Sequence, residues 1–238
     1  MANSKDLTTI LKAYQHIFHP VISFDKKKDK ILLMDFTEKN IELNENIFNH
    51  TSSFAHYINQ RLQSANARYG IGGYAESRAF YSRSKVFDPV GKSEEPRRLH
   101  LGIDIWGKLG TPVFAPFGGT VHSFKFNDAF GDYGATIILQ HQLDTVLFYT
   151  LYGHLSHADL GSLRTGQFIS VGETFAHFGG EKENGHWPPH LHFQIIADME
   201  NMKGDYPGVC TLSDAKKYLA NCPDADIILQ LMQYAVGN

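Results

Sequence analysis

Residues 190–195 read His-Leu-His-Phe-Gln-Ile and end the most β-rich part of the chain. Successive residues of a strand point to opposite faces of a sheet, so His190 and His192 are predicted to share one face. Leu191 and Phe193 then point to the other face, towards the core. Two imidazoles on one face are a candidate chemical site, because histidine binds metals and exchanges protons near neutral pH.

The residues before this segment have the pattern of an antiparallel β-domain. From Leu99 onward the sequence consists of short β-rich runs separated by glycine and proline, among them GTVHSFKF, ATIILQH and TVLFYTLYG. Hydrophobic residues alternate within residues 120–126, as in a half-buried strand, whereas the continuous apolar run 137–139 is typical of a central strand. The sequence therefore predicts a mainly β fold.

The start of the chain has a different, mixed pattern. Residues 7–18 and 46–64 carry apolar side chains at helical spacing, which predicts two helices. Residues 21–24 and 31–36 are predicted as two short strands around a lysine-rich turn. The glycine-rich residues 69–74 are predicted to interrupt the second helical pattern.

These differences divide the chain into two predicted parts. Residues 1–85 are interpreted as an α/β N-terminal appendage, and residues 86–238 as a β-domain with short C-terminal helices. The polar stretch 88–98, which contains two prolines, is predicted as a linker or surface loop. A helix is predicted over residues 214–219, before Pro223.

Composition and charge exclude several classes of protein. The 238 residues are 42% hydrophobic and 20% charged, which is typical of a soluble globular chain. A formal net charge of −3 provides no basic field for nucleic acid. No stretch approaches the roughly 20 apolar residues of a membrane span, and no secretory signal is visible, so a cytoplasmic location is expected. Cys210 and Cys222 are too few for a disulfide scaffold and are interpreted as free or buried thiols.

Two fragments upstream supply partners for the histidine pair. His100 and Asp104 lie four positions apart around Gly102, which tolerates the backbone bend needed to bring them together. His154 follows directly after a predicted strand, in the fragment YGHLS. Two neutral imidazoles and one carboxylate make a three-ligand zinc site that leaves the fourth position for water.

Together the fragments HLGID, YGHLS and HLHFQI resemble the lysostaphin and LytM type of zinc metallopeptidases, in which such motifs occur in this order. The resemblance covers residues 99–197 and includes the connecting stretches GTPVFAPFGGTV and VGETFAHFGG. It implies an antiparallel β-sandwich of the duplicated hybrid motif kind, with zinc in a groove. The stretches GIGGYAESRAFYSRS and GHWPPHLHFQI are similar to a subgroup fused to aminotransferase-like enzymes, which implies association with other enzyme domains.

Carried over residue by residue, the resemblance implies that His100, Asp104 and His192 bind Zn²⁺. It leaves His154 and His190 as two catalytic histidines that do not bind the metal. His190 is the candidate general base and His154 the candidate oxyanion donor or acid, and the two roles are interchangeable on the sequence alone. The implied activity is that of a zinc-dependent endopeptidase acting on peptidoglycan-type peptides.

The sequence also departs from this family in two respects. Members usually carry an export signal or anchor, which is not visible here. Some place a tyrosine shortly before the first ligand, whereas the ten residues before His100 are VGKSEEPRRL.

Alternative interpretations concern both the function and the first 85 residues. The chain could be a cytosolic metal-binding or partner-binding module, and VFAPFGGTVHSF also resembles a half-motif of biotinyl or lipoyl carriers and of phosphotransferase IIA domains. Asp104 argues against the carrier and the phosphotransferase, because its spacing from His100 has no purpose in either of them. We expect an open groove; the alternative is that Asn46, Asn49 or His50 occupies the open position of the zinc.

Overall fold

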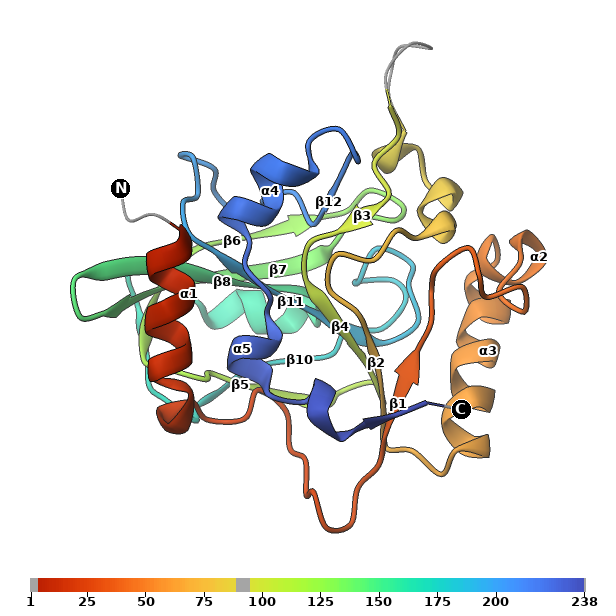
Figure 1. Cartoon of the computed structure of the whole chain (residues 1–238), viewed down its shortest axis with the longest axis horizontal. Helices are drawn as coiled ribbons and strands as arrows, with labels where there is room; N and C mark the ends of the chain where they lie inside the picture. Colours follow the sequence, from red (N-terminus) through yellow and green to blue (C-terminus); the bar gives the residue numbers. More distant parts are fainter. Residues whose placement is uncertain (1–3, 89–94, 238) are drawn as a thin grey trace.

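The computed structural model describes residues 4–88 and 95–237. Within them, the largest element is a nine-stranded mixed sheet with the order β13-β1-β2-β4-β11-β8-β7-β6-β9 (Figure 1). Its strands are β1 (Ile31–Met34), β2 (Tyr69–Gly72), β4 (Ile103–Trp106), β6 (Gly119–Asn127), β7 (Gly134–Leu143), β8 (Val146–Leu155), β9 (Phe168–Ile169), β11 (His190–Ile196) and β13 (Ala235–Val236). Two small antiparallel sheets pair β5 (Pro112–Phe114) with β10 (Thr174–His177), and β3 (Leu99–His100) with β12 (Val209–Cys210).

Helices are few and lie at the two ends of the chain. The α-helices are α1 (Ser4–Ala13), α2 (Glu45–Phe48), α3 (Thr51–Ser64), α4 (Ala215–Asn221) and α5 (Asp226–Leu229). Short 3₁₀ helices are η1 (Gln15–Ile17), η2 (Ala79–Arg83), η3 (Lys85–Phe87), η4 (His157–Ser162) and η5 (Met232–Tyr234). The predicted mainly β fold class is confirmed, whereas the sandwich and the duplicated motif stay predictions. Among the described helices, none has the length and apolar character of a membrane span.

Strands β4 and β11 lie side by side near the middle of the large sheet, and their side chains point alternately to its two faces. Leu191 and Phe193 of β11 are buried in the same hydrophobic core as Ile103 and Ile105 of β4. Because successive residues of a strand point to opposite faces, the remaining side chains of both strands point to the other face, as the sequence predicted for residues 190–195. This opposite face holds the candidate site.

The N-terminal residues join this sheet in a way that the sequence did not predict. The predicted hairpin is wrong: residues 21–24 form no strand, and β1 pairs in parallel with β2 and β13. The predicted end of the second helical pattern before residues 69–74 is confirmed, because α3 ends at Ser64; the sequence did not predict that this stretch contains β2, which pairs with β4. A Cβ atom on Gly70 would lie 2.9 Å from Met34 Cγ, so this glycine permits close packing and does not form a turn.

The sheet is continuous across the predicted division at residue 85. Strand β2 lies between β1 and β4, so residues on both sides of that division supply neighbouring strands. Figure 1 shows α3 beside β1 and β2, while α1 packs near α5 on the other side of the molecule. Of the predicted surface loop 88–98, residues 89–94 lie outside the described part of the chain. Cys210 and Cys222 are buried and form no disulfide.

Candidate metal centre

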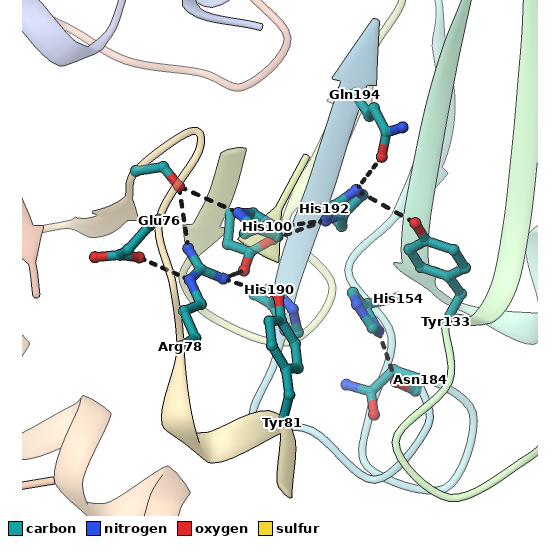
Figure 2. A network of polar contacts seen from close by, with 12 residues as sticks. Glu76, Arg78, Tyr81, His100, Tyr133, His154, Asn184, His190, His192 and Gln194 are labelled. Atoms are coloured by element: carbon teal, nitrogen blue, oxygen red, sulfur yellow. Dashed lines mark hydrogen bonds and ion pairs between the residues drawn. The ribbon is translucent and has the colours of Figure 1, made fainter. Parts of the chain in front are cut away.

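The three residues predicted as ligands converge on one point. In the register of the sheet, His192 on β11 lies opposite Asp104 on β4. His100 Nε2 lies 2.9 Å from His192 Nδ1 and 3.2 Å from Asp104 Oδ1, and the latter two atoms are 3.0 Å apart (Figure 2). Four-coordinate zinc with bonds of about 2.0–2.1 Å needs ligand atoms roughly 3.3 Å apart. The three atoms therefore fit a single ion of this kind.

The backbone at Gly102 makes this convergence possible. In a straight strand, residues four positions apart would be roughly 13 Å apart. The break between β3 and β4 brings the side chains of His100 and Asp104 within hydrogen-bonding distance. A Cβ atom at Gly102 would lie 2.7 Å from both the His192 ring and the Phe193 carbonyl oxygen. Glycine is required here because any side chain would collide with the His192 ring and the Phe193 carbonyl oxygen.

Hydrogen bonds orient both imidazoles for metal binding. His100 Nδ1 lies 3.1 Å from the Gly73 carbonyl oxygen, which can only accept, so Nδ1 donates and Nε2 keeps its lone pair. His192 Nε2 lies 2.9 Å from Gln194 Oε1, which leaves the Nδ1 lone pair for the ion. The amide nitrogen of Gln194 donates to the Pro207 carbonyl oxygen, and this fixes the orientation of the amide. Such outer hydrogen bonds are typical of metal-binding histidines.

The electrostatics of the cluster favour a cation. Burial and, after it, the charge of Arg78 lower the pKa of His100 to about 4. Burial by itself would raise the pKa of Asp104, but His100 and Arg78 hold it well below its usual value. At neutral pH the imidazole is therefore neutral and the carboxylate ionised, which are the forms that bind a metal ion.

The two predicted catalytic histidines lie beside the cluster. His190 is opposite Trp106 in the sheet, and the two rings stack at 3.9 Å. The rings of His154 and His190 also stack, at 4.0 Å. His154 Nδ1 donates to the Asn184 carbonyl oxygen and His190 Nδ1 to that of Pro188, each at 2.8 Å.

These hydrogen bonds determine which nitrogen of each ring can react. Burial lowers the pKa of His190 to about 4 and holds that of His154 well below its usual value. Both rings are therefore neutral at pH 7, with the proton on Nδ1 and a lone pair on Nε2. Each Nε2 can accept a proton from a reactant, and the protonated ring can then donate it.

The site opens into one pocket of about 280 Å³. Its polar lining includes Asp104, His154, His190 and His192. Its aromatic lining consists of Phe80, Tyr81, Phe87, Trp106, Tyr133, Tyr206 and Trp187. Two of the predicted ligands and both predicted catalytic histidines therefore line the same pocket.

The alternative donors named from the sequence do not enter this pocket. Asn46, Asn49 and His50 are exposed, and none of them lines it. His186 also lies outside the lining, with its ring 5.4 Å from that of Phe130. In the described part of the chain, the N-terminal residues form a wall of the pocket through Phe80 and Tyr81.

The structure adds residues that sequence reasoning missed. Arg78 forms an ion pair with Asp104, and the hydroxyl of Tyr133 lies 3.5 Å from His192 Nε2 (Figure 2). Gln194 could have been found, because it follows His192 by two positions and must share its face. Arg78 lies in the stretch GIGGYAESRAFYSRS, whose resemblance gave it no role, and Tyr133 lies in a stretch without a motif, so the sequence analysis assigned neither residue to the site.

Comparisons with known proteins agree with the motif assignment. Residues 98–203 match the model of Peptidase family M23. The chain is 28% identical over 140 residues to peptidoglycan DD-endopeptidase ShyC of Vibrio cholerae, which covers 55% of this chain and 30% of that protein. It is 33% identical over 106 residues to the lipoprotein NlpD/LppB homolog of Pseudomonas aeruginosa, an alignment that covers 44% of this chain and 32% of that protein. The chain thus spans about a third of the length of these relatives.

Among solved structures, the catalytic domain of lysostaphin from Staphylococcus simulans is 22% identical to this chain, with a TM-score of 0.40. The alignment covers 68% of this chain and 97% of the lysostaphin domain. The matched residues 98–203 contain all five site residues predicted from the sequence.

Proposed function

We propose that the chain is a zinc-dependent endopeptidase that hydrolyses amide bonds of peptidoglycan-type peptides. The observation that carries the proposal is the convergence of His100 Nε2, Asp104 Oδ1 and His192 Nδ1 within 2.9–3.2 Å of one another, beside two neutral histidines. The names of the relatives support the substrate class, since they include a peptidoglycan DD-endopeptidase and a DD-carboxypeptidase/endopeptidase. Location in the cytoplasm and association with other enzyme domains stay predictions.

The side chains divide the chemistry between them. A zinc ion at the three ligands would supply a Lewis acid that activates water and polarises the scissile carbonyl. Nε2 of His190 or His154 accepts the proton of the attacking water. The protonated ring then returns this proton through Nε2 to the leaving amine, and the other imidazole donates to the developing oxyanion only when its own Nε2 carries a proton. The carbonyl partners of both Nδ1 atoms keep the rings in the required tautomer.

The proposal is tested with the purified chain, cross-linked peptidoglycan fragments and zinc. We expect one zinc per chain and the appearance of new amino termini, detected by mass spectrometry. A chelator should stop hydrolysis and added zinc should restore it, because the chelator competes with the protein ligands for an ion that binds reversibly. A chain that binds one zinc and cleaves no peptide would instead favour a metal-dependent binding module. A chain that binds no zinc would contradict the ligand assignment itself.

Replacing either catalytic histidine should lower turnover while leaving the zinc in place. We expect His190→Ala and His154→Asn each to reduce kcat/KM by roughly a hundredfold or more, the effect of losing a general base or oxyanion donor. Asparagine is chosen for His154 because φ at this residue is +63°, a conformation that asparagine tolerates better than alanine.

The matched control is His122→Ala, since His122 lies on β6 outside the pocket. Zinc content and thermal stability are measured on every variant beside the rate. If both His154→Asn and His190→Ala keep the original rate, these two residues have no part in the reaction.

A further inference from the structure

The N-terminal residues contribute a buried cation to the candidate metal centre. The side chain of Arg78 is completely buried, although arginine is almost never found so unless it is paired. Its Nη1 donates to Asp104 Oδ2 and, at 3.3 Å, to the hydroxyl of Tyr81. Its Nε donates to Glu76 Oε2 at 2.7 Å, and Nη2 lies 3.4 Å from the Gly73 carbonyl oxygen. Figure 2 shows the Arg78 guanidinium beside Glu76 and Tyr81.

These contacts give the two oxygens of Asp104 different partners. Oδ1 faces His100 Nε2 and His192 Nδ1, at 3.2 and 3.0 Å. Oδ2 accepts the hydrogen bond from Arg78. The carboxylate is therefore held in a rotation that presents one oxygen to the ligand cluster, while a cation engages the other.

The guanidinium is itself fixed in place. Glu76 holds Arg78 Nε through Oε2, and the other oxygen of Glu76 accepts from the backbone N–H of Phe36, at 3.1 Å. A Cβ atom at Gly72 would lie 2.7 Å from Arg78 Nη2, so the absence of a side chain there leaves room for the guanidinium. The planar fork of arginine can serve both carboxylates at once, which a lysine ammonium cannot do in the same geometry.

We propose that Arg78 is a positioning residue of the metal centre, which restricts Asp104 to ligation through Oδ1. This inference rests on the proposed function, because it presupposes an ion at the three ligands. It also assigns a role to the N-terminal residues: Arg78 orients one ligand, and the Gly73 carbonyl oxygen orients another, His100. Arg78 does not line the pocket, so it acts through Asp104 and not on the substrate.

The inference predicts weaker and differently coordinated metal in Arg78 variants of the full chain. We expect Arg78→Met to lower zinc affinity 10- to 100-fold, the usual effect of removing a partner of a metal ligand. Arg78→Lys keeps the charge and should recover part of this loss. Affinity is measured by competition with a chromophoric chelator, on protein shown by circular dichroism to be folded without metal.

Cobalt provides a readout that a loss of stability alone would not change. The visible spectrum of bound Co²⁺ reports the number and geometry of its ligands. If Asp104 turns to bind through both oxygens in the Arg78 variants, the bands of the four-coordinate ion should weaken. The matched control is Arg68→Met, which removes an ion pair with Asp29 from the same segment without touching the site. Its zinc affinity and cobalt spectrum should equal those of the original chain.

The outcomes separate this inference from the proposed function. An original chain that binds no zinc would overturn both. If the original chain binds zinc and the Arg78 variants match it in affinity and in cobalt spectrum, the positioning role is overturned while the function stands. If Arg78→Met does not fold because it leaves two carboxylates unpaired, the zinc affinity and cobalt spectrum of Arg78→Lys decide whether Arg78 has the positioning role.

Discussion

Replacing His192 by alanine is expected to remove zinc from the chain and to lower the rate of peptide hydrolysis by at least about a thousandfold. In the proposed site His192 supplies one of three protein ligands, and its Nδ1 lies within 3.0 Å of the ligand atoms of His100 and Asp104. A bound metal ion contributes several kcal/mol of transition-state stabilisation, and a loss of about 4 kcal/mol corresponds to a thousandfold in rate. Zinc content is measured by elemental analysis, and turnover with the peptidoglycan fragments.

His192→Ala tests the ligand assignment with less effect on stability than Asp104→Asn would have. Asp104→Asn would remove a charge from the buried pair with Arg78, and breaking such a pair costs roughly 3–5 kcal/mol of stability. Loss of activity in that variant would thus combine loss of metal with partial unfolding. His122→Ala again serves as the control for the removal of one histidine. A His192→Ala protein that still holds one zinc and hydrolyses peptide at the original rate would contradict the ligand assignment.

Deleting residues 1–75 is expected to abolish folding, and activity with it. The deletion removes β1 and β2, and thereby exposes the edge of β4, the strand that carries Asp104. It also removes seven side chains that are at most 2% exposed in the core shared with β4 and β11: Leu7, Leu11, Val21, Ile22, Ile31, Tyr69 and Ile71. At about 1.5–3 kcal/mol for each buried side chain, their loss is on the order of 10 kcal/mol. The total stability of a domain is only about 5–15 kcal/mol.

A shorter deletion provides the control for this experiment. Removing residues 1–18 takes away α1 with Leu7 and Leu11 but leaves β1, β2 and the contacts of Arg78 intact. We expect a loss of several kcal/mol in unfolding free energy and an unchanged zinc affinity. Solubility, circular dichroism and zinc content are compared for both truncated proteins. If residues 76–238 alone fold, bind zinc and cleave peptides faster than the full chain, residues 1–75 are an inhibitory segment.

Local sequence patterns predicted the central part of the site. The alternation in residues 190–195 placed His190 and His192 on one face because the side-chain period of a strand is two, whatever the strand pairs with. The bend at Gly102, which brings His100 and Asp104 together, is likewise a property of a single residue. These features depend on backbone geometry over a few positions, and they are visible without knowledge of the rest of the fold.

The residues around the site were decided by the tertiary structure. Arg78 meets Asp104 across 26 positions and Tyr133 meets His192 across 59, and no local pattern specifies such a pairing. The hairpin prediction failed for the same reason: β1 satisfies its hydrogen bonds with β2 and β13, strands far away in the sequence. The sequence alone thus determined which side chains could bind a metal. The packing of the N-terminal strands against β4 determined which residues hold these side chains in place. Buried charges and strand edges find their partners only when the whole sheet is assembled.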